Sequence, residues 1–305
     1  MTFTADFINF TIIPTPKGRS IMKKSIGFVD YYINEWHANN YVGWIKEASE
    51  RLGLDFEVRY AWAELERDPR ENMSTDEWCT KYGITKCKSI DELSEKSDYI
   101  IILAPSNPET HLRYAEAVLK YGKNTYIDKT FAPDLATANR IFDIANAHGT
   151  KFFSSSALRY ARELEYTKGA DLLTTKGGGS LFDEYIIHQT EMTVKSLGTD
   201  PERVRTESLE GGDKNVYVEF ASGKHGKMMY SQNNVFSVSA EFKNGSKYAE
   251  NVNSSFTFTG LIDDMLRFFE SGEVSFDTKE TLSVAFVREA AISSAKEDGE
   301  WINFQ

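Results

Sequence analysis

His188 is the residue whose type and surroundings point most directly to chemistry. Its imidazole titrates near neutral pH when unperturbed, so it can accept or donate a proton under physiological conditions. Glu184 lies four residues earlier in a stretch predicted to be helical, and residues four apart share one face of a helix. We therefore expect Glu184, rather than Asp183, to contact the ring and hold it in one tautomer. The competing interpretation is a core histidine, because Ile186 and Ile187 precede it.

The segment 26–37 reads IGFVDYYINEWH, a buried strand that runs into a helix. Dinucleotide-binding domains carry the fingerprint GxGxxG at this junction, because glycines permit a tight turn and let the backbone approach a diphosphate. Asp30, Tyr32 and Glu35 fill the three glycine positions here. They add bulk, and the two carboxylates oppose an anion at the helix N-terminus. The sequence therefore predicts weak or unusually posed dinucleotide binding, with Asp30 or Asn34 capping the helix instead.

Aromatic rings gather at the same junction, where Tyr31, Tyr32, Trp36 and His37 follow the strand. They either fill the volume that a dinucleotide would occupy or stack on a sugar or a nicotinamide, and filling is the simpler interpretation. Glu64 lies near the end of the second predicted strand, where an acid commonly binds the adenosine ribose. It favours NAD over NADP as the ligand of such a domain.

A second group of candidates follows the third long apolar run. His111 comes after Pro105 and Asn107, in a loop at the carboxyl end of a predicted strand. Ligands of open α/β sheets collect at this edge, so His111 is a candidate substrate contact. A structural role at the start of a helix is an equally good interpretation.

The elements that must position these residues form two patterns. The first half alternates short apolar runs with helix-period segments, which predicts a parallel doubly wound sheet. The predicted strands are 25–29, 56–63, 99–103, 124–127 and 151–154, and the predicted helices are 38–52, 74–82, 90–95, 109–121 and 134–148. Glycine follows four of these helices, and glycine is the residue that most often caps the C-terminal end of a helix.

After about residue 155 the pattern changes. One helix is predicted at 184–197, and strands are predicted at 203–209, 215–221, 226–236 and 237–243. Two further helices are predicted at 257–271 and 278–296. Strands bracketed by helices indicate an α+β domain with one antiparallel sheet. We expect one face of this sheet to meet a partner chain, because apolar and polar residues alternate too imperfectly along its strands for a solvated face. The apolar residues concerned are Val216, Val218, Phe220, Met228, Tyr230, Val235 and Phe236.

Composition sets the remaining limits. The chain has 305 residues, 41% apolar and 27% charged, which is typical of a globular protein of about two domains. A net charge of −11 argues against nucleic acid or an anionic membrane as a partner. Cys79 and Cys87 lack metal-ligand spacing, so we expect free thiols, no metal site and a cytoplasmic location. Residues 1–21 are interpreted as an N-terminal extension, because Met22 leads directly into the first strand.

Four segments resemble the family of glucose-fructose oxidoreductase, inositol dehydrogenase and rhizopine-catabolism proteins (Gfo/Idh/MocA). The first is the strand and helix start that ends at His37. The others are 98–111 (DYIIILAPSNPETH), 121–130 (YGKNTYIDKT) and 177–191 (GGGSLFDEYIIHQTE). Their order resembles that family over about residues 22–305. The resemblance implies a Rossmann-like α/β domain at 22–154 and an α+β domain for substrate binding and oligomerisation at 155–305, which together form a homodimer or homotetramer.

The resemblance also implies roles for individual residues. Lys129 matches the lysine of the family's EKP motif, which lies beside the nicotinamide and positions substrate. His188 matches the histidine that takes the substrate hydroxyl proton as hydride leaves, with Glu184 as its helper. The implied cofactor contacts are Asp30, Tyr31, Tyr32, Glu64, Pro105, Asn107 and Asp128. The implied substrate contacts are His111, Arg159, Asp183 and Glu191, of which Arg159 is also a candidate interdomain contact.

Departures from the family pattern are equally informative. The glutamate of EKP is Asp128 here and the proline is Thr130, so the restraint that proline places on the backbone is lost. One extra residue separates the glycines from His188, which leaves open whether Asp183 or Glu184 replaces the family aspartate.

Two functions follow from the sequence. The leading hypothesis is an oxidoreductase that acts on a hydroxyl carbon of a sugar, polyol or related small metabolite with NAD or NADP, and it rests on Lys129 and His188. The alternative is a non-redox protein on the same scaffold, either a ligand-binding or regulatory subunit or a lyase-like enzyme. The three lost glycines favour that alternative.

Overall fold

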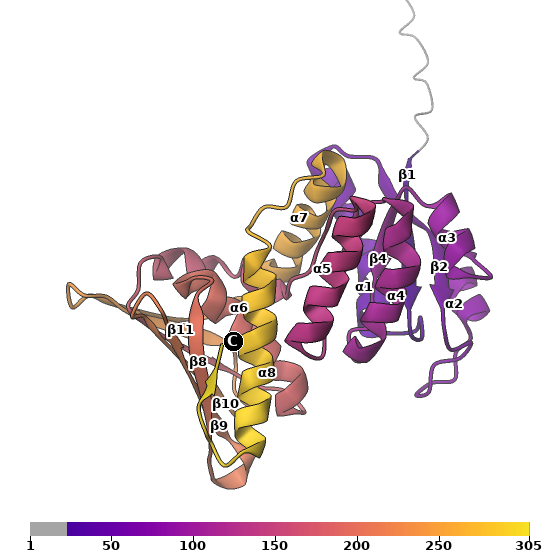
Figure 1. Ribbon diagram of the computed structural model, residues 1–305. Coiled ribbons are helices and arrows are strands. Elements are labelled where there is room, and N and C mark those ends of the chain that lie inside the picture. The colour runs from indigo at the N-terminus through magenta and orange to yellow at the C-terminus, as the bar shows by residue number, and fades with distance from the viewer. Residues whose placement is uncertain (1–22, 305) are drawn as a thin grey trace, which may run out of the picture.

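The computed structural model describes residues 23–304, so the interpretation of residues 1–21 as an extension falls outside the described residues. A parallel sheet with strand order β3-β2-β1-β4-β5-β6 forms the first domain. In Figure 1 this domain is the part of the molecule labelled β1, β2 and β4. Its strands are β1 (Lys24–Asp30), β2 (Phe56–Ala63), β3 (Thr85–Lys86), β4 (Tyr99–Ile102), β5 (Thr125–Ile127) and β6 (Phe152–Phe153). The predicted doubly wound sheet is confirmed, and the short edge strand β3 is an addition to it.

Helices connect these strands, as the parallel order requires. They are α1 (Trp36–Leu52), α2 (Thr75–Tyr82), α3 (Ile90–Lys96), α4 (His111–Val118) and α5 (Leu135–His148). Tyr41, Ile45 and Ala48 of α1 are fully buried at helical spacing, which fixes the face that α1 turns to the sheet. Gly53 ends α1 in the left-handed conformation at φ 67°, as its predicted capping role requires.

The second domain is built on a sheet with strand order β12-β11-β7-β10-β9-β8-β13. Its strands are β7 (Leu172–Gly177), β8 (Pro201–Ser208), β9 (Lys214–Phe220), β10 (His225–Tyr230), β11 (Ser237–Glu241), β12 (Lys247–Asn251) and β13 (Ile302–Asn303). The predicted α+β domain is confirmed, and its sheet is antiparallel except that β7 and β10 pair in parallel. The strand β7 was missed in the sequence because its LLTTKG segment is only half apolar.

Three long helices complete the chain: α6 (Phe182–Leu197), α7 (Thr257–Ser271) and α8 (Lys279–Lys296). The helices α6 and α8 pack on one face of the second sheet, whereas α7 lies with the first domain (Figure 1). Leu261, Met265 and Phe268 of α7 share a buried cluster with Phe28 and Tyr41. The chain therefore returns to its first domain after building the second sheet.

The second sheet alternates more regularly than the sequence indicated. Val216, Val218, Phe220, Met228 and Tyr230 are all buried in the cluster beneath α6 and α8. These residues therefore cannot serve as the apolar surface for a partner chain, and this part of the sequence argument was wrong. Residues of β9 and β10 at the intervening positions, such as Tyr217 and Met229, lie on the opposite face and are half-buried.

The described residues contain no helix long and apolar enough to cross a membrane. In the same part of the chain, no group of three or more His, Cys, Asp or Glu side chains is arranged to hold a metal ion.

Candidate functional site

A cavity of about 400 Å³ lies between the two domains, where the carboxyl ends of β4 and β5 face α6. The ligands of open α/β sheets bind at this edge. Its polar lining includes His37, Ser106, Lys129, Glu184 and His188, and its apolar lining includes Trp36, Leu158, Tyr185, Phe236 and Phe258. The structure thus brings together Lys129, His188 and Glu184, the three predicted catalytic residues.

His37 and Asp128 form a buried pair at the wall of this cavity. His37 lies in the first turn of α1, and its Nδ1 is hydrogen-bonded to Oδ2 of Asp128, which follows β5. The other carboxylate oxygen of Asp128 accepts from the Lys129 amide at 2.8 Å and from the Tyr126 hydroxyl at 3.2 Å. The Tyr41 ring stacks on the imidazole with centroids 5.2 Å apart. The ring of His37 is therefore fixed from several sides.

Charge pairing decides the state of this carboxyl group. Burial alone would raise the pKa of Asp128, but the adjacent His37 and Lys129 outweigh burial and lower it. Asp128 is therefore a carboxylate that can stabilise a protonated His37. Nε2 of His37 makes no hydrogen bond to any residue that the structure describes, and His37 lines the cavity. This nitrogen is consequently free for a ligand.

Lys129 enters the cavity from the residue after Asp128. Its Nζ donates a hydrogen bond of 3.2 Å to the carbonyl oxygen of Pro105, which follows β4. The side chain is half-buried and lies in the same lining as His37 and His188. One ammonium donor is thus committed to the backbone, which leaves two that can reach a ligand.

His188 differs from the expectation in its partner. Its Nδ1 lies 2.7 Å from Oγ of Ser156, and Oγ itself accepts from the Leu158 amide. Glu184 does lie one helical turn earlier and lines the cavity, but it makes no hydrogen bond to the ring within residues 23–304. The predicted Glu184–His188 contact is therefore wrong, because the ring turns toward the segment after β6. Asp183 does not replace Glu184 as the partner of the ring; its carbonyl oxygen accepts from Arg288 at 2.8 Å.

The surroundings of His188 keep its ring neutral. Removal of the ring from water, together with the positive charge of Lys129, lowers its pKa to about 3. A neutral imidazole presents one donor and one acceptor. If the Ser156 hydroxyl donates to Nδ1, the ring proton lies on Nε2 and is available to a substrate oxygen.

The loop after β1 is packed with its own side chains. Asp30 is buried, and its Oδ1 accepts from the amides of Tyr31 and Ala104 at 2.7 and 3.0 Å. Desolvation raises the pKa of Asp30 well above its ordinary value. Tyr32 and Glu35 are buried as well, and the Arg70 guanidinium lies 5.9 Å from the Tyr32 ring centroid. These side chains do not fit a diphosphate resting on the loop as it does on a glycine fingerprint.

The caps predicted for α1 are also absent. Glu35 is the N-cap residue and makes no side-chain capping bond, while the Asn34 amide donates to Asp68 and Glu71 at 3.0 and 3.1 Å. The loop is thus held by the segment after β2, which the sequence does not indicate.

Glu64 follows β2 as expected, but its carboxylate already has partners. Arg113 pairs with Oε2, and the Tyr114 hydroxyl donates to the same oxygen at 2.7 Å. These bonds lower the pKa of Glu64 despite the opposing effect of partial burial. A ribose hydroxyl would share this carboxylate with two residues of α4.

The cavity lining also excludes four further predicted residues, His111, Asn107, Arg159 and Glu191. Both ring nitrogens of His111 contact backbone carbonyls, Phe131 O at 2.9 Å and Leu103 O at 2.6 Å, so the ring joins the ends of β4 and β5. Arg159 is buried between Glu191 at 3.1 Å and Glu280 at 2.6 Å, which ties η3 (Ala157–Tyr160) to α6 and α8. Asn107 donates to Glu109 at 3.1 Å.

Two site residues were not singled out from the sequence. Ser156 contacts His188 from a run of three serines after β6, and Tyr126 donates to Asp128 from within β5. Hydroxyl residues of this kind occur throughout the chain, so no local signal marks them. His37 was recognised only as one of several aromatic rings, because its carboxylate partner lies 91 residues away.

Comparisons with known proteins agree with the fold and the motifs. The sequence model of the Gfo/Idh/MocA oxidoreductase family, described as having an NAD-binding Rossmann fold, matches residues 65–156. An uncharacterized oxidoreductase, YhhX of Escherichia coli (strain K12), is 27% identical over 103 residues, which are 32% of this chain and 29% of that protein. The match therefore spans less than a third of that relative.

Solved structures extend the likeness over almost the whole chain. The myo-inositol dehydrogenase of Lactobacillus casei, solved with NAD(H) and myo-inositol, superposes with a TM-score of 0.76 at 10% identity, covering 93% of this chain and 97% of that one. A probable dehydrogenase of Thermotoga maritima gives a TM-score of 0.73 at 15% identity, covering 92% and 98%. At such identities the likeness shows the fold, and with the matched segment it confirms the resemblance predicted from the motifs.

Proposed function

We propose, on the premise that this chain belongs to the Gfo/Idh/MocA family, that it is an oxidoreductase of a hydroxyl-bearing carbon. The substrate class is a sugar, a polyol or a related small metabolite, and the hydride partner is an NAD-type dinucleotide. The observation that carries the proposal is the convergence of His37, Lys129 and His188 on one cavity at the carboxyl edge of the sheet. Oxidation of an alcohol needs a group that takes the hydroxyl proton and a charge that stabilises the developing alkoxide.

The residues of the cavity divide these tasks between them. His37 accepts the proton at Nε2, because the Asp128 carboxylate on its other nitrogen stabilises the imidazolium that forms. The Lys129 ammonium faces the alkoxide oxygen, and neutral His188 donates a hydrogen bond that orients it. Bound dinucleotide supplies the hydride acceptor. This division departs from the family resemblance, which gives the proton to His188, because the carboxylate partner here belongs to His37.

Turnover with candidate substrates tests the proposal. The full chain is incubated with NAD or NADP and a panel of inositols, sugars and sugar alcohols, and the absorbance of reduced nicotinamide is followed. We expect turnover with at least one polyhydroxylated compound and a loss of about 100-fold or more in kcat for Lys129→Met and His37→Asn. Lys151→Met, which changes an exposed lysine outside the cavity, is the matched control. Absence of turnover with the whole panel and both cofactors would contradict the proposal.

Asp128 is proposed to act through His37, so its test needs a readout beyond rate. Asp128→Asn removes the charge that stabilises the imidazolium formed when His37 takes the substrate proton. The acid limb of kcat/KM should therefore move to lower pH, together with a lower plateau. An unchanged limb with a uniformly lower rate would indicate a structural role only.

One observation favours the second candidate, a non-redox enzyme or binding protein on this scaffold. Tyr32 and Glu35, which stand at two glycine positions of the fingerprint, have buried side chains in the loop on which a diphosphate normally rests. A protein that transfers protons without hydride needs only the cavity and its histidines. Deuterium uptake from D₂O at a substrate carbon, in the absence of any nicotinamide, would identify that activity.

A further inference from the structure

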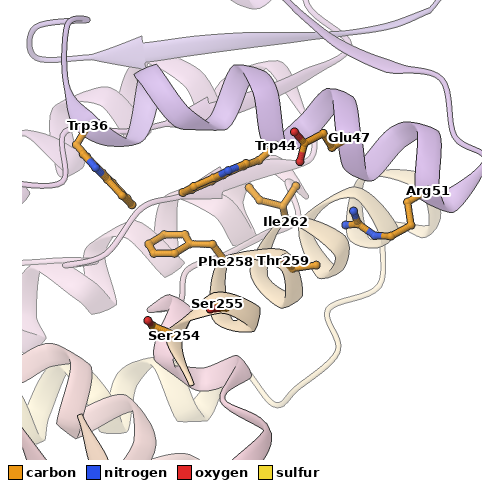
Figure 2. Close-up of a pocket in the computed structure, with 9 residues that line it drawn as sticks. All are labelled: Trp36, Trp44, Glu47, Arg51, Ser254, Ser255, Phe258, Thr259 and Ile262. Atoms are coloured by element: carbon orange, nitrogen blue, oxygen red, sulfur yellow. The ribbon is translucent and has the colours of Figure 1, made fainter. Parts of the chain in front are cut away.

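A second cavity, of about 320 Å³, opens beside the first along the groove between α1 and α7. Trp36, Ser254 and Phe258 line both cavities, so the two adjoin each other. Figure 2 shows Trp36 and Trp44 pointing from α1 toward Phe258 of α7, with Ser254 and Ser255 below them. The groove leads from the reacting groups toward Arg51 at the far end of α1.

The lining of this groove is aromatic at its centre and polar at its rim. The Trp44 and Phe258 rings lie 4.9 Å apart between centroids, and Trp36 lies 5.5 Å from Trp44. Trp36 is 51% exposed, although it is a large apolar residue beside a buried histidine. It packs against the partly exposed Trp44 and Phe258, and a group of apolar rings at the surface, unlike a single one, is typical of a binding site.

The rim residues have hydrogen-bonding groups that the protein does not use. Glu47 makes no ion pair, and the hydroxyls of Ser254 and Ser255 make no hydrogen bond, with any residue in the range 23–304. Arg51 pairs with Asp263 of α7, which fixes the closed end of the groove. A ligand here would meet aromatic faces on one side and free oxygens on the other.

We infer that this groove, lined by Trp36, Trp44, Phe258 and Glu47, is a subsite for the second ring of a glycoside whose first ring reacts in the adjoining cavity. A pyranose has a C–H face that packs on the electron-rich face of an aromatic ring, and hydroxyls at its edge that bond to carboxylate and serine oxygens. A volume of about 320 Å³ lies at the lower end of the range for ligand pockets, which suits one ring.

Other occupants fit the lining less well. The unpaired Glu47 carboxylate and the net charge of −11 oppose a phosphate or a nucleotide. A purely apolar ligand would leave the rim oxygens without partners. The inference deepens the proposed function, since it rests on a hydroxyl-bearing first ring in the cavity of His37, Lys129 and His188.

Binding measurements on the full chain test the subsite without any turnover. Calorimetry compares glucose with maltose and cellobiose, galactose with lactose, and myo-inositol with a galactosyl inositol. We expect at least one two-ring compound to bind about tenfold more tightly than its single-ring counterpart, which is about 1.4 kcal/mol. Equal affinities within every pair, or no binding of any of these compounds, would overturn the inference.

Variants confined to the groove locate the effect. Trp44 and Glu47 line this cavity but not the reacting one, so Trp44→Ala and Glu47→Gln should abolish the two-ring preference and leave single-ring affinity unchanged. Trp44→Phe should retain part of the preference, which guards against loss of folding. Lys46→Ala, on an exposed position of the same helix outside the groove, is the control. Equal weakening of single-ring and two-ring ligands by Trp44→Ala would contradict a separate subsite.

The binding measurements distinguish a failure of the subsite from a failure of the redox proposal. Two-ring preference without any nicotinamide turnover would support the subsite and count against the oxidoreductase. Turnover of single-ring substrates with no two-ring preference would support the oxidoreductase and remove the subsite.

Discussion

Two histidines line one cavity, and their partners give them different chemistry. His37 has a buried carboxylate on one nitrogen, whereas His188 has the hydroxyl of Ser156. A carboxylate stabilises the protonated ring, and a hydroxyl does so much less. The two rings are therefore suited to proton transfer and to neutral hydrogen bonding, respectively.

The low pKa of His188 makes the fold sensitive to acid. An unfolded histidine titrates near 6.5, whereas His188 in the folded chain titrates near 3. Between these values the unfolded chain binds a proton that the folded chain does not, so the free energy of unfolding falls as pH drops through this window. We predict that His188→Asn reduces the loss of stability between pH 7 and pH 5 by about 1–2 kcal/mol, measured by urea unfolding.

The exposed His225 provides the control for this measurement. His225→Asn should lose as much stability as the natural chain over the same pH range. Identical pH dependence in the natural chain and in His188→Asn would show that the ring is not held neutral by the fold.

At the residue scale, the sequence identifies functional side chains better than their partners. Lys129 and His188 were identified from motifs that resemble a known family, and both line the cavity. The partner of His188 was misassigned, because helical spacing shows which residues share a face but not which way a ring turns. Ser156 and Asp128 reach their histidines across the fold, at 32 and 91 residues of separation.

The loop between β1 and α1 is the element that decides cofactor binding. It joins a parallel strand to a helix, as in a dinucleotide-binding domain, but the side chains of Tyr32 and Glu35 are buried in it. Glu35 also lies 3.9 Å from Arg70, so part of its charge is balanced by the segment after β2.

We predict weak binding of NAD, with a Kd above about 1 μM by calorimetry, because the loop cannot cradle a diphosphate and a nearby carboxylate repels it. Glu35→Gln keeps the volume and removes the charge, and it should tighten binding by up to about tenfold. Glu64→Gln should weaken binding, since it replaces a charged acceptor of ribose hydroxyls by a weaker neutral amide. Sub-micromolar binding by the natural chain, unaffected by Glu35→Gln, would show that the missing glycines are irrelevant.

The strand β1 and the helix α3 approach closely at Gly27. A Cβ atom at this position would lie 2.4 Å from Oγ of Ser97 and 2.6 Å from Cδ2 of Leu93. We predict that Gly27→Ala lowers the free energy of unfolding by about 1–3 kcal/mol, as overpacking of a buried contact does. Thermal or urea unfolding measures the change.

Gly43 offers a matched control in the middle of α1, where a Cβ atom would meet nothing within 4 Å. Gly43→Ala should raise stability by about 0.5–1 kcal/mol, because alanine favours the helix. Equal effects of the two substitutions would contradict the packing at Gly27.

At the element scale, strong apolar periodicity was sufficient to predict a helix or a strand from the sequence, and weak periodicity was not. The strand β2 and the helix α7 have the residues predicted for them, 56–63 and 257–271. The strands β3 and β13 were missed because two residues show no period, and β12 was missed because its KYAEN segment is mostly exposed. Tertiary pairing rather than local pattern determines such short edge strands.

At the scale of the whole molecule, the two domains are joined by α7 and by the buried group of Arg159, Glu191 and Glu280. The Arg159 guanidinium also lies 3.7 Å from the Phe276 ring centroid. Leu158, the residue before Arg159, lines the interdomain cavity, so these ion pairs anchor one of the cavity walls.

The open face of the second sheet is the surface through which we expect this chain to dimerise. Tyr217 and Met229 lie on it, and Trp301 beside it is covered by Arg203 with the guanidinium 4.5 Å from the ring centroid. We predict a mass in light scattering of about twice 34.6 kDa and a shift toward monomer for Met229→Glu, which places charge in the middle of the face. A natural chain that is monomeric at micromolar concentration would contradict this prediction.

The most direct test of the proposed function is a crystal structure of the full chain soaked with NAD and a polyol that it binds. We predict a nicotinamide ring in the cavity beside Lys129, a substrate hydroxyl within hydrogen-bond distance of Nε2 of His37, and a diphosphate displaced outward from Tyr32 and Glu35. A cavity that holds the polyol but no nicotinamide, at NAD concentrations that saturate related enzymes, would contradict hydride transfer and leave the non-redox function as the account of this site.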